Sequence, residues 1–131
     1  MLEYSYTKLN DNSPIPIVRV SINNLRNNKY FQHDAILDTG SDVTLVSISI
    51  ISKLEPPRIG RVKIKPKGLG GKEIGIAPHR INLGFTESEV IKVKVWSCVD
   101  RDLEEFIILG RNFLNRYKIT FDGINNKFII Y

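Results

Sequence analysis

The chain has 131 residues, enough for one domain with a hydrophobic core. Its hydrophobic residues (42%) and charged residues (25%) are typical of a folded globular protein, which argues against disorder. The net charge of +5 is compatible with nucleic-acid binding, but acidic residues interrupt most of the basic stretches. No stretch approaches the roughly 20 apolar residues of a membrane span. We therefore expect neither nucleic acid nor membrane as a partner.

The cysteine and histidine residues limit which disulfides and metal sites the chain can form. Cys98 is the single cysteine, so no disulfide can form within the chain, and we expect a reducing, cytoplasmic setting. The first six residues lack a signal-peptide pattern. His33 and His79 are not at metal-ligand spacing with Cys98, which favours surface or satisfied core positions for both. There is no phosphate-binding loop and no serine-nucleophile motif.

Short strands separated by turn residues dominate the chain, and no long segment has a helical period. In chain order, strands are predicted at residues 17–22, 30–37, 43–46, 61–65, 73–76, 80–83, 90–99 and 106–109. A short helix is predicted at 47–54, one or two helical turns at 112–117, and a closing hairpin at 119–131. The pattern predicts one all-β domain spanning residues 1–131, without a linker. A long hairpin at about 61–76 has a glycine-rich tip that contains Gly68, Leu69, Gly70 and Gly71.

Asp38 ends an apolar strand and precedes Thr39, Gly40 and Ser41. A carboxylate at the end of a buried strand needs hydrogen bonds. Gly40 permits a tight turn that brings backbone amides close, and the hydroxyl groups of Thr39 and Ser41 can brace the carboxylate. One interpretation is a reactive carboxylate on a rigid turn. The alternative is an ordinary aspartate between strand and turn.

Peptide hydrolysis by carboxylates needs two of them that share one proton. No other acidic residue of the chain lies in a matching frame; the similar segment 106–112 has Leu109-Gly110-Arg111 instead. Segments 35–41 and 106–112 form a weak internal repeat, which is compatible with two halves packed across a pseudo-twofold axis. Either the site is not a pair of carboxylates, or a symmetric partner supplies the second aspartate. Such a site also needs a cover, and the glycine-rich tip at 68–71 is a candidate lid.

These segments resemble the motifs of retropepsins, the dimeric aspartic proteases of retroviruses and their cellular relatives. Segment 35–41 resembles the active-site motif, 68–71 the glycine-rich flap, and 107–112 the second motif, all in family order. The resemblance covers roughly Ile15 to Tyr117. It implies a closed retropepsin-like β-barrel with a flap hairpin and one or two short helices. It also implies a homodimeric endopeptidase that acts on a protein or peptide substrate without metal or cofactor.

The resemblance also implies roles for single residues. Asp38 resembles the catalytic aspartate, Thr39 the residue that links the two active-site loops across the dimer, and Gly40 the residue whose carbonyl contacts substrate. Asp42 resembles a contact to the substrate backbone that also forms an ion pair with Arg111, which would be partly buried. The alternative for Asp42 and Arg111 is two unrelated surface charges.

Two further residues have open interpretations. Ser41 stands where alanine is common in viral members, and its hydroxyl is expected to stabilise the charged Asp38 carboxylate, which predicts an acidic pH optimum. The alternative is a small turn residue. Leu69 is either a pocket or closure residue or an exposed loop leucine.

The hairpin at 119–131 extends past the point where viral members end, and it resembles cellular and microbial members. We therefore expect a dimer interface that differs in detail from the viral one. Two other functions remain open: an inactive, dimeric peptide-binding module of the same fold, and a basic nucleic-acid-binding protein. Cleavage that depends on Asp38 distinguishes the enzyme from the binding module. Binding that weakens steeply with salt would indicate nucleic acid.

Overall fold

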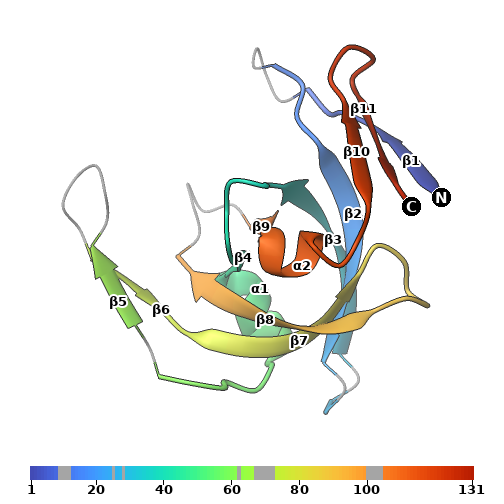
Figure 1. Ribbon diagram of the computed structural model, residues 1–131. Helices are drawn as coiled ribbons and strands as arrows, with labels where there is room; N and C mark the ends of the chain where they lie inside the picture. Colours follow the sequence, from blue (N-terminus) through green and yellow to red (C-terminus); the bar gives the residue numbers. More distant parts are fainter. Residues whose placement is uncertain (9–12, 25, 28, 62, 67–72, 100–104) are drawn as a thin grey trace.

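The computed structural model describes residues 1–8, 13–24, 26–27, 29–61, 63–66, 73–99 and 105–131. Across these residues the chain forms a closed β-barrel, a separate two-stranded hairpin and a three-stranded sheet (Figure 1). The barrel strands are β2 (Ile17–Asn24), β3 (Lys29–Leu37), β4 (Thr44–Ser47), β7 (Pro78–Gly84), β8 (Ile91–Cys98) and β9 (Ile107–Leu109). Their order around the barrel is β2-β3-β9-β4-β8-β7. The predicted all-β barrel is therefore confirmed.

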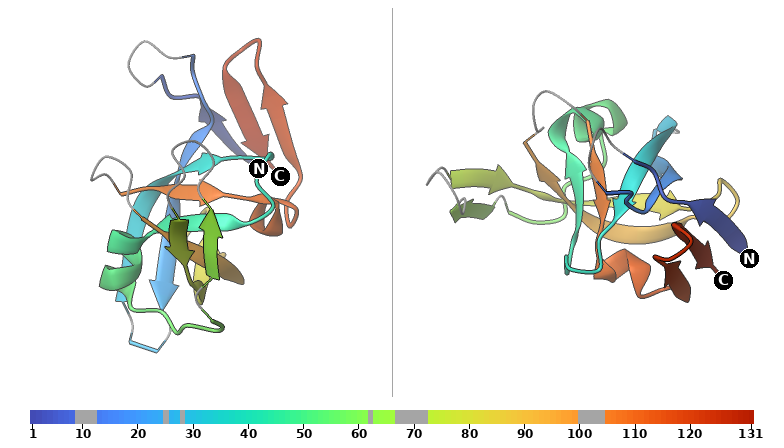
Figure 2. Two further views of the ribbon diagram at one scale, coloured as in Figure 1. Left: turned by 90° about the vertical axis from the view of Figure 1, so that its left-hand side faces the viewer. Right: turned by 90° about the horizontal axis from the view of Figure 1, so that it is seen from above.

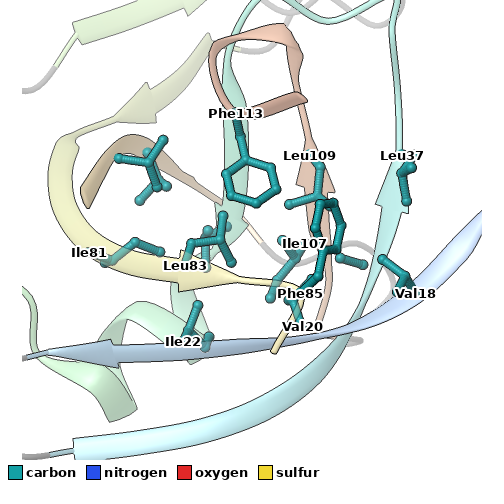
Figure 3. Packing of buried hydrophobic residues seen from close by; sticks show 14 of the residues in the cluster. Val18, Val20, Ile22, Leu37, Ile81, Leu83, Phe85, Ile107, Leu109 and Phe113 are labelled. Carbon is teal, nitrogen blue, oxygen red and sulfur yellow. The ribbon is translucent and has the colours of Figure 1, made fainter. Parts of the chain in front are cut away.

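Side chains of every barrel strand contribute to one buried core, and on β9 they alternate between buried and partly exposed positions. On β2, for example, Val18, Val20 and Ile22 are buried. Figure 3 shows these side chains pointing into one interior together with residues of β3, β7 and β9. Phe113 closes this core and packs edge-on against Phe85, with the ring centroids 5.2 Å apart.

Two short helices complete the barrel among the described residues. Helix α1 (Ile48–Leu54) buries Ile50, Ile51 and Leu54, and it ends at Glu55, whose φ of 53° is left-handed. This agrees with the helix predicted at 47–54. Helix α2 (Arg111–Leu114) is shorter than the predicted 112–117, and a turn follows it. No helix in the described part of the chain has the length and apolar character needed to cross a membrane.

The β5–β6 hairpin projects away from the barrel. Its strands β5 (Lys63–Pro66) and β6 (Glu73–Ile76) are antiparallel and agree with the strands predicted at 61–65 and 73–76. Figures 1 and 2 show the hairpin on one side of the barrel and the chain termini on the other. The glycine-rich tip, with Gly68, Leu69, Gly70 and Gly71, lies outside the described residues.

The two ends of the chain meet in a terminal sheet. Its strands are β1 (Leu2–Ser5), β10 (Ile119–Asp122) and β11 (Lys127–Ile130), with β11 in the middle. The sequence predicted the β10–β11 hairpin but not β1. Tyr4 of β1 stacks on Phe128 of β11, with the ring centroids 5.1 Å apart, so aromatic packing helps to hold β1 in place.

Candidate active site

The two glycine turns singled out in the sequence lie side by side. Strand β9 runs between β3 and β4, parallel to β3 and antiparallel to β4. Leu37 is paired with Leu109, so both strands end at the same level, and the Asp38 amide donates a hydrogen bond to the Leu109 carbonyl at 2.9 Å. The fold thus brings the Asp38 turn next to the Gly110 turn, although 72 residues separate Asp38 from Gly110.

The two turns interlock at Gly110. The Arg111 amide donates to the Ser41 carbonyl at 2.8 Å, and the Gly110 amide donates to Thr44 Oγ1 at 3.1 Å. A Cβ atom on Gly110 would lie 2.1 Å from the Val43 carbonyl oxygen. Since this contact is with backbone, any side chain at position 110 would push the two turns apart.

The Asp38 carboxylate is exposed and is oriented by its own turn. Its Oδ1 accepts a hydrogen bond from the Gly40 amide at 2.9 Å, and the Ser41 amide donates to the Asp38 carbonyl at 3.2 Å. The amide contact that the sequence predicted for Gly40 is therefore present. Asp38, Thr39 and Gly40 are all exposed in the single chain, so a reactant can approach the carboxylate directly.

Ser41 does not contact the Asp38 carboxylate. Its hydroxyl donates to the Val43 carbonyl at 2.7 Å. A hydroxyl group has one proton to donate, so this bond leaves none for the carboxylate. The direct hydrogen bond expected from the Ser41 hydroxyl to the Asp38 carboxylate is therefore absent.

Arg111 and Asp42 do not form the ion pair that the sequence predicted. Both side chains are exposed, and no ion pair between described residues includes either of them. Instead, Arg111 Nη1 donates to the Thr39 carbonyl at 2.7 Å. Arg111 thus contacts the Asp38 turn through a backbone oxygen, which a planar guanidinium can reach from the start of α2.

Comparison with solved structures identifies the architecture. The retropepsin-like aspartic protease from Rickettsia conorii aligns with 100% of this chain and 99% of its own, with a TM-score of 0.62 and 18% identity. The EIAV protease complexed with the inhibitor HBY-793 aligns with 83% of this chain and 93% of its own, with a TM-score of 0.52 and 22% identity. The chain has the retropepsin-like fold. The resemblance inferred from the motifs is thus confirmed at the level of fold, while the sequence matches no protein-family model and no curated protein.

The motif at 107–112 includes Asn112, but the sequence assigned no role to this residue and did not single out Thr44. Thr44 Oγ1 donates to Asn112 Oδ1 at 2.7 Å, and Asn112 Nδ2 donates to the Lys94 carbonyl at 2.8 Å. The bonds join the strand after the Asp38 turn to the helix after the Gly110 turn. One signal was available in the sequence, because Thr44 places a polar side chain at a core position of a short apolar strand.

An uncovered row of aliphatic side chains lies beside Asp38. Ile36, Ile108 and Leu45 are paired across β3, β9 and β4, so they share one face of the sheet. All three are partly exposed, while their neighbours along each strand are buried on the opposite face. This row begins at Ile36, two residues before Asp38.

Two hollows of the described surface lie away from Asp38. One of about 210 Å³ lies beside His33, Lys53 and Glu105, and a smaller one of about 70 Å³ lies beside Phe85 and Tyr117. Neither is lined by a residue of the Asp38 turn. Among the described residues, no group of three or more His, Cys, Asp or Glu side chains is arranged to hold a metal ion.

Proposed function

We propose that the chain is an aspartic endopeptidase whose active site forms between two copies, each of which contributes Asp38. The observation that carries the proposal is an exposed carboxylate on a backbone-bonded turn in a retropepsin-like fold. Leu37 is paired with Leu109, so the position that corresponds to Asp38 in the second turn is Gly110, which has no carboxylate. Hydrolysis by carboxylates needs two of them, so a symmetric partner is the simplest source of the second.

In the proposed dimer the two Asp38 carboxyl groups share one proton and hold a water molecule. The ionised carboxylate accepts a proton from this water while the water oxygen forms a bond to the substrate carbonyl carbon. The protonated carboxyl group donates its proton to the substrate carbonyl oxygen. The resulting tetrahedral intermediate, a gem-diol, breaks at its C–N bond: the carboxyl pair donates a proton to the leaving amine, and one hydroxyl group of the intermediate returns a proton to the pair as it becomes the carbonyl of the acid product. Because one carboxyl must be charged and the other neutral, activity should rise and fall across the acidic range.

The substrate that this arrangement favours is an extended peptide with apolar side chains near the cleaved bond. The row of Ile36, Ile108 and Leu45 provides an apolar floor for such side chains. Gly40, Ser41 and Asp42 continue from the carboxylate along the same loop, and we assign them to contacts with the peptide. Thr39 is assigned to the contact between the two loops, with Arg111 as its support.

The proposal includes three further assignments: a cover for the site, the domain boundaries and the cellular setting. The glycine-rich tip with Gly68, Leu69, Gly70 and Gly71 is assigned as the cover over the bound peptide, because the β5–β6 hairpin leads to it. Residues 1–131 are taken as a single domain. The cytoplasmic setting expected from the lone Cys98 is also part of the proposal.

Cleavage of a mixed peptide library tests the proposal. Wild type should cleave the library, and a statine-type inhibitor should block the reaction. Asp38→Asn should abolish cleavage while peptide binding survives. The matched control is Asp34→Asn, because Asp34 is an exposed aspartate paired with Arg19 at 3.5 Å, and this variant should cleave at the wild-type rate. A wild type that binds peptides and cleaves none would contradict the proposal and indicate a peptide-binding module.

A further inference from the structure

Thr44 is a polar residue at the centre of the interlocked turns. It is the first residue of β4, six positions after Asp38, and its relative exposure is 0%. Burying a hydroxyl group is unfavourable unless its hydrogen bonds are made. Thr44 makes two, because Oγ1 accepts from the Gly110 amide at 3.1 Å and donates to Asn112 Oδ1 at 2.7 Å.

Only one arrangement of protons satisfies this group of bonds. The Lys94 carbonyl can only accept, so the nitrogen of the Asn112 amide must face Lys94 and its oxygen must face Thr44. The Thr44 proton then points at Asn112, which leaves a lone pair of Oγ1 for the Gly110 amide. Asn112 therefore fixes the direction of the Thr44 hydroxyl, and Thr44 fixes the position of Gly110.

Gly110 lies between Leu109 and Arg111, whose backbone groups form hydrogen bonds with the Asp38 turn. On one side, Leu109 accepts the Asp38 amide bond; on the other, the Arg111 amide donates to Ser41. A shift of Gly110 displaces both of these anchors together. Both are backbone bonds, so no single side chain controls them directly, whereas the Thr44 bond depends on one hydroxyl group.

We propose that Thr44, oriented by Asn112, is a positioning residue that sets the place of the Asp38 carboxylate through Gly110. Its effect on cleavage rests on the proposed protease function, but its effect on the position of Asp38 does not. Catalysis by two carboxylates requires close placement, and a displacement of about 1 Å can lower a rate by about a hundredfold. Loss of the hydroxyl should therefore lower kcat by about ten- to a hundredfold and leave KM nearly unchanged.

The test compares Thr44→Val, which keeps the shape and removes the hydroxyl, with Thr44→Ser, which keeps the hydroxyl. Active sites are first counted with a tight-binding inhibitor, so that kcat refers to folded sites alone. Thr44→Val and Asn112→Ala should each lower kcat per site, and their combination should cost little more than either alone. Thr44→Ser should stay close to wild type. A purely structural role would lower the number of active sites and leave kcat per site unchanged, which would overturn the proposal.

Amide chemical shifts of Asp38 and Gly40 give a readout that does not need activity. They should move in Thr44→Val and Asn112→Ala, and return in Thr44→Ser. If wild type cleaves nothing but these shifts behave as expected, the protease proposal fails while the positioning role stands. If Thr44→Val does not fold, Asn112→Ala and Thr44→Ser decide the question by the same shifts. Unmoved Asp38 and Gly40 shifts in Asn112→Ala would overturn the positioning role.

Discussion

At the scale of single residues, backbone groups orient the Asp38 carboxylate, and the Gly40 amide is the donor to its Oδ1. Ser41 uses its hydroxyl on Val43. Ser41→Ala should therefore leave the pH dependence of cleavage unchanged and cost about 1 kcal/mol of unfolding free energy, because one partly buried hydrogen bond is lost. Rate against pH and urea unfolding on both proteins measure this. A profile that moves toward neutral pH would show that the hydroxyl reaches Asp38 after all.

His79 makes stability depend on pH. It is buried in β7, and its Nδ1 lies 3.3 Å from the Pro56 carbonyl. Burial lowers the pKa of His79 below its ordinary value of 6.5; the bond to Pro56 partly offsets this, and nearby Arg58 adds to the lowering. The unfolded chain therefore takes up this proton at a higher pH than the folded chain. The stability contribution is complete above about pH 6.5 and is lost as the pH falls below it.

Thermal unfolding at pH 7.5 and pH 5 measures the effect of His79. Wild type should lose stability between these values, and His79→Gln should lose less. The matched control is His33→Gln, because His33 is a partly exposed histidine beside Glu105, and this variant should retain the loss. A His79→Gln protein that destabilises with acid as much as wild type would contradict the assignment.

The sequence could locate the residues of the site but not the bonds of their side chains. Asp38, Gly40 and Gly110 were found because tight turns and close backbone approach require particular residue types at those positions. The partners of Ser41 and Arg111 were predicted wrongly because nearby carbonyl groups compete for the same donors. A choice between the Val43 carbonyl and the Asp38 carboxylate depends on rotamers, which the residue pattern does not encode.

At the scale of elements, the interlocked turns depend on the missing side chain of Gly110. Gly110→Ala places a Cβ atom 2.1 Å from the Val43 oxygen, so the turns must separate. We expect a loss of about 1 to 3 kcal/mol in unfolding free energy, together with a large loss of kcat. Gly123→Ala is the control, since a Cβ there meets no atom within 4 Å, and it should stay within about 0.5 kcal/mol of wild type. Equal stability and kcat for the two variants would contradict the interlock.

Most of the elements were predictable because their apolar residues alternate between two turn signals. Strands β2 and β3 were found in this way, and they pair along almost their whole length. Strand β1 was missed because its partner β11 lies at the other end of the chain, so no local hairpin signal marks it. Helix α2 was predicted too long, because the polar residues after Leu114 are as suitable for a turn as for a helix.

At the scale of the whole molecule, most of the exposed large apolar side chains among the described residues lie on the terminal sheet or directly next to its strands. These are Met1, Leu2, Phe121, Ile124 and Tyr131. We infer that the proposed dimer covers them. Ile124, in the turn between β10 and β11, has a relative exposure of 94%, so Ile124→Asp should weaken dimerisation at least tenfold without unfolding the chain. Ile48→Asp on α1 is the control and should dimerise normally. Sedimentation over a range of concentrations measures both, and an unchanged dimer in Ile124→Asp would place the interface elsewhere.

The most direct test of the central claim is to mix wild-type and Asp38→Asn subunits in equal amounts, with total concentration well above the dimer dissociation constant. The subunits are first separated by dilution and then reconcentrated so that they pair at random. If each active site needs Asp38 from both copies, activity should fall to about one quarter of an all-wild-type sample, because about one quarter of the pairs are wild type on both sides. An activity of about one half would mean that each chain works alone, and it would contradict the shared active site.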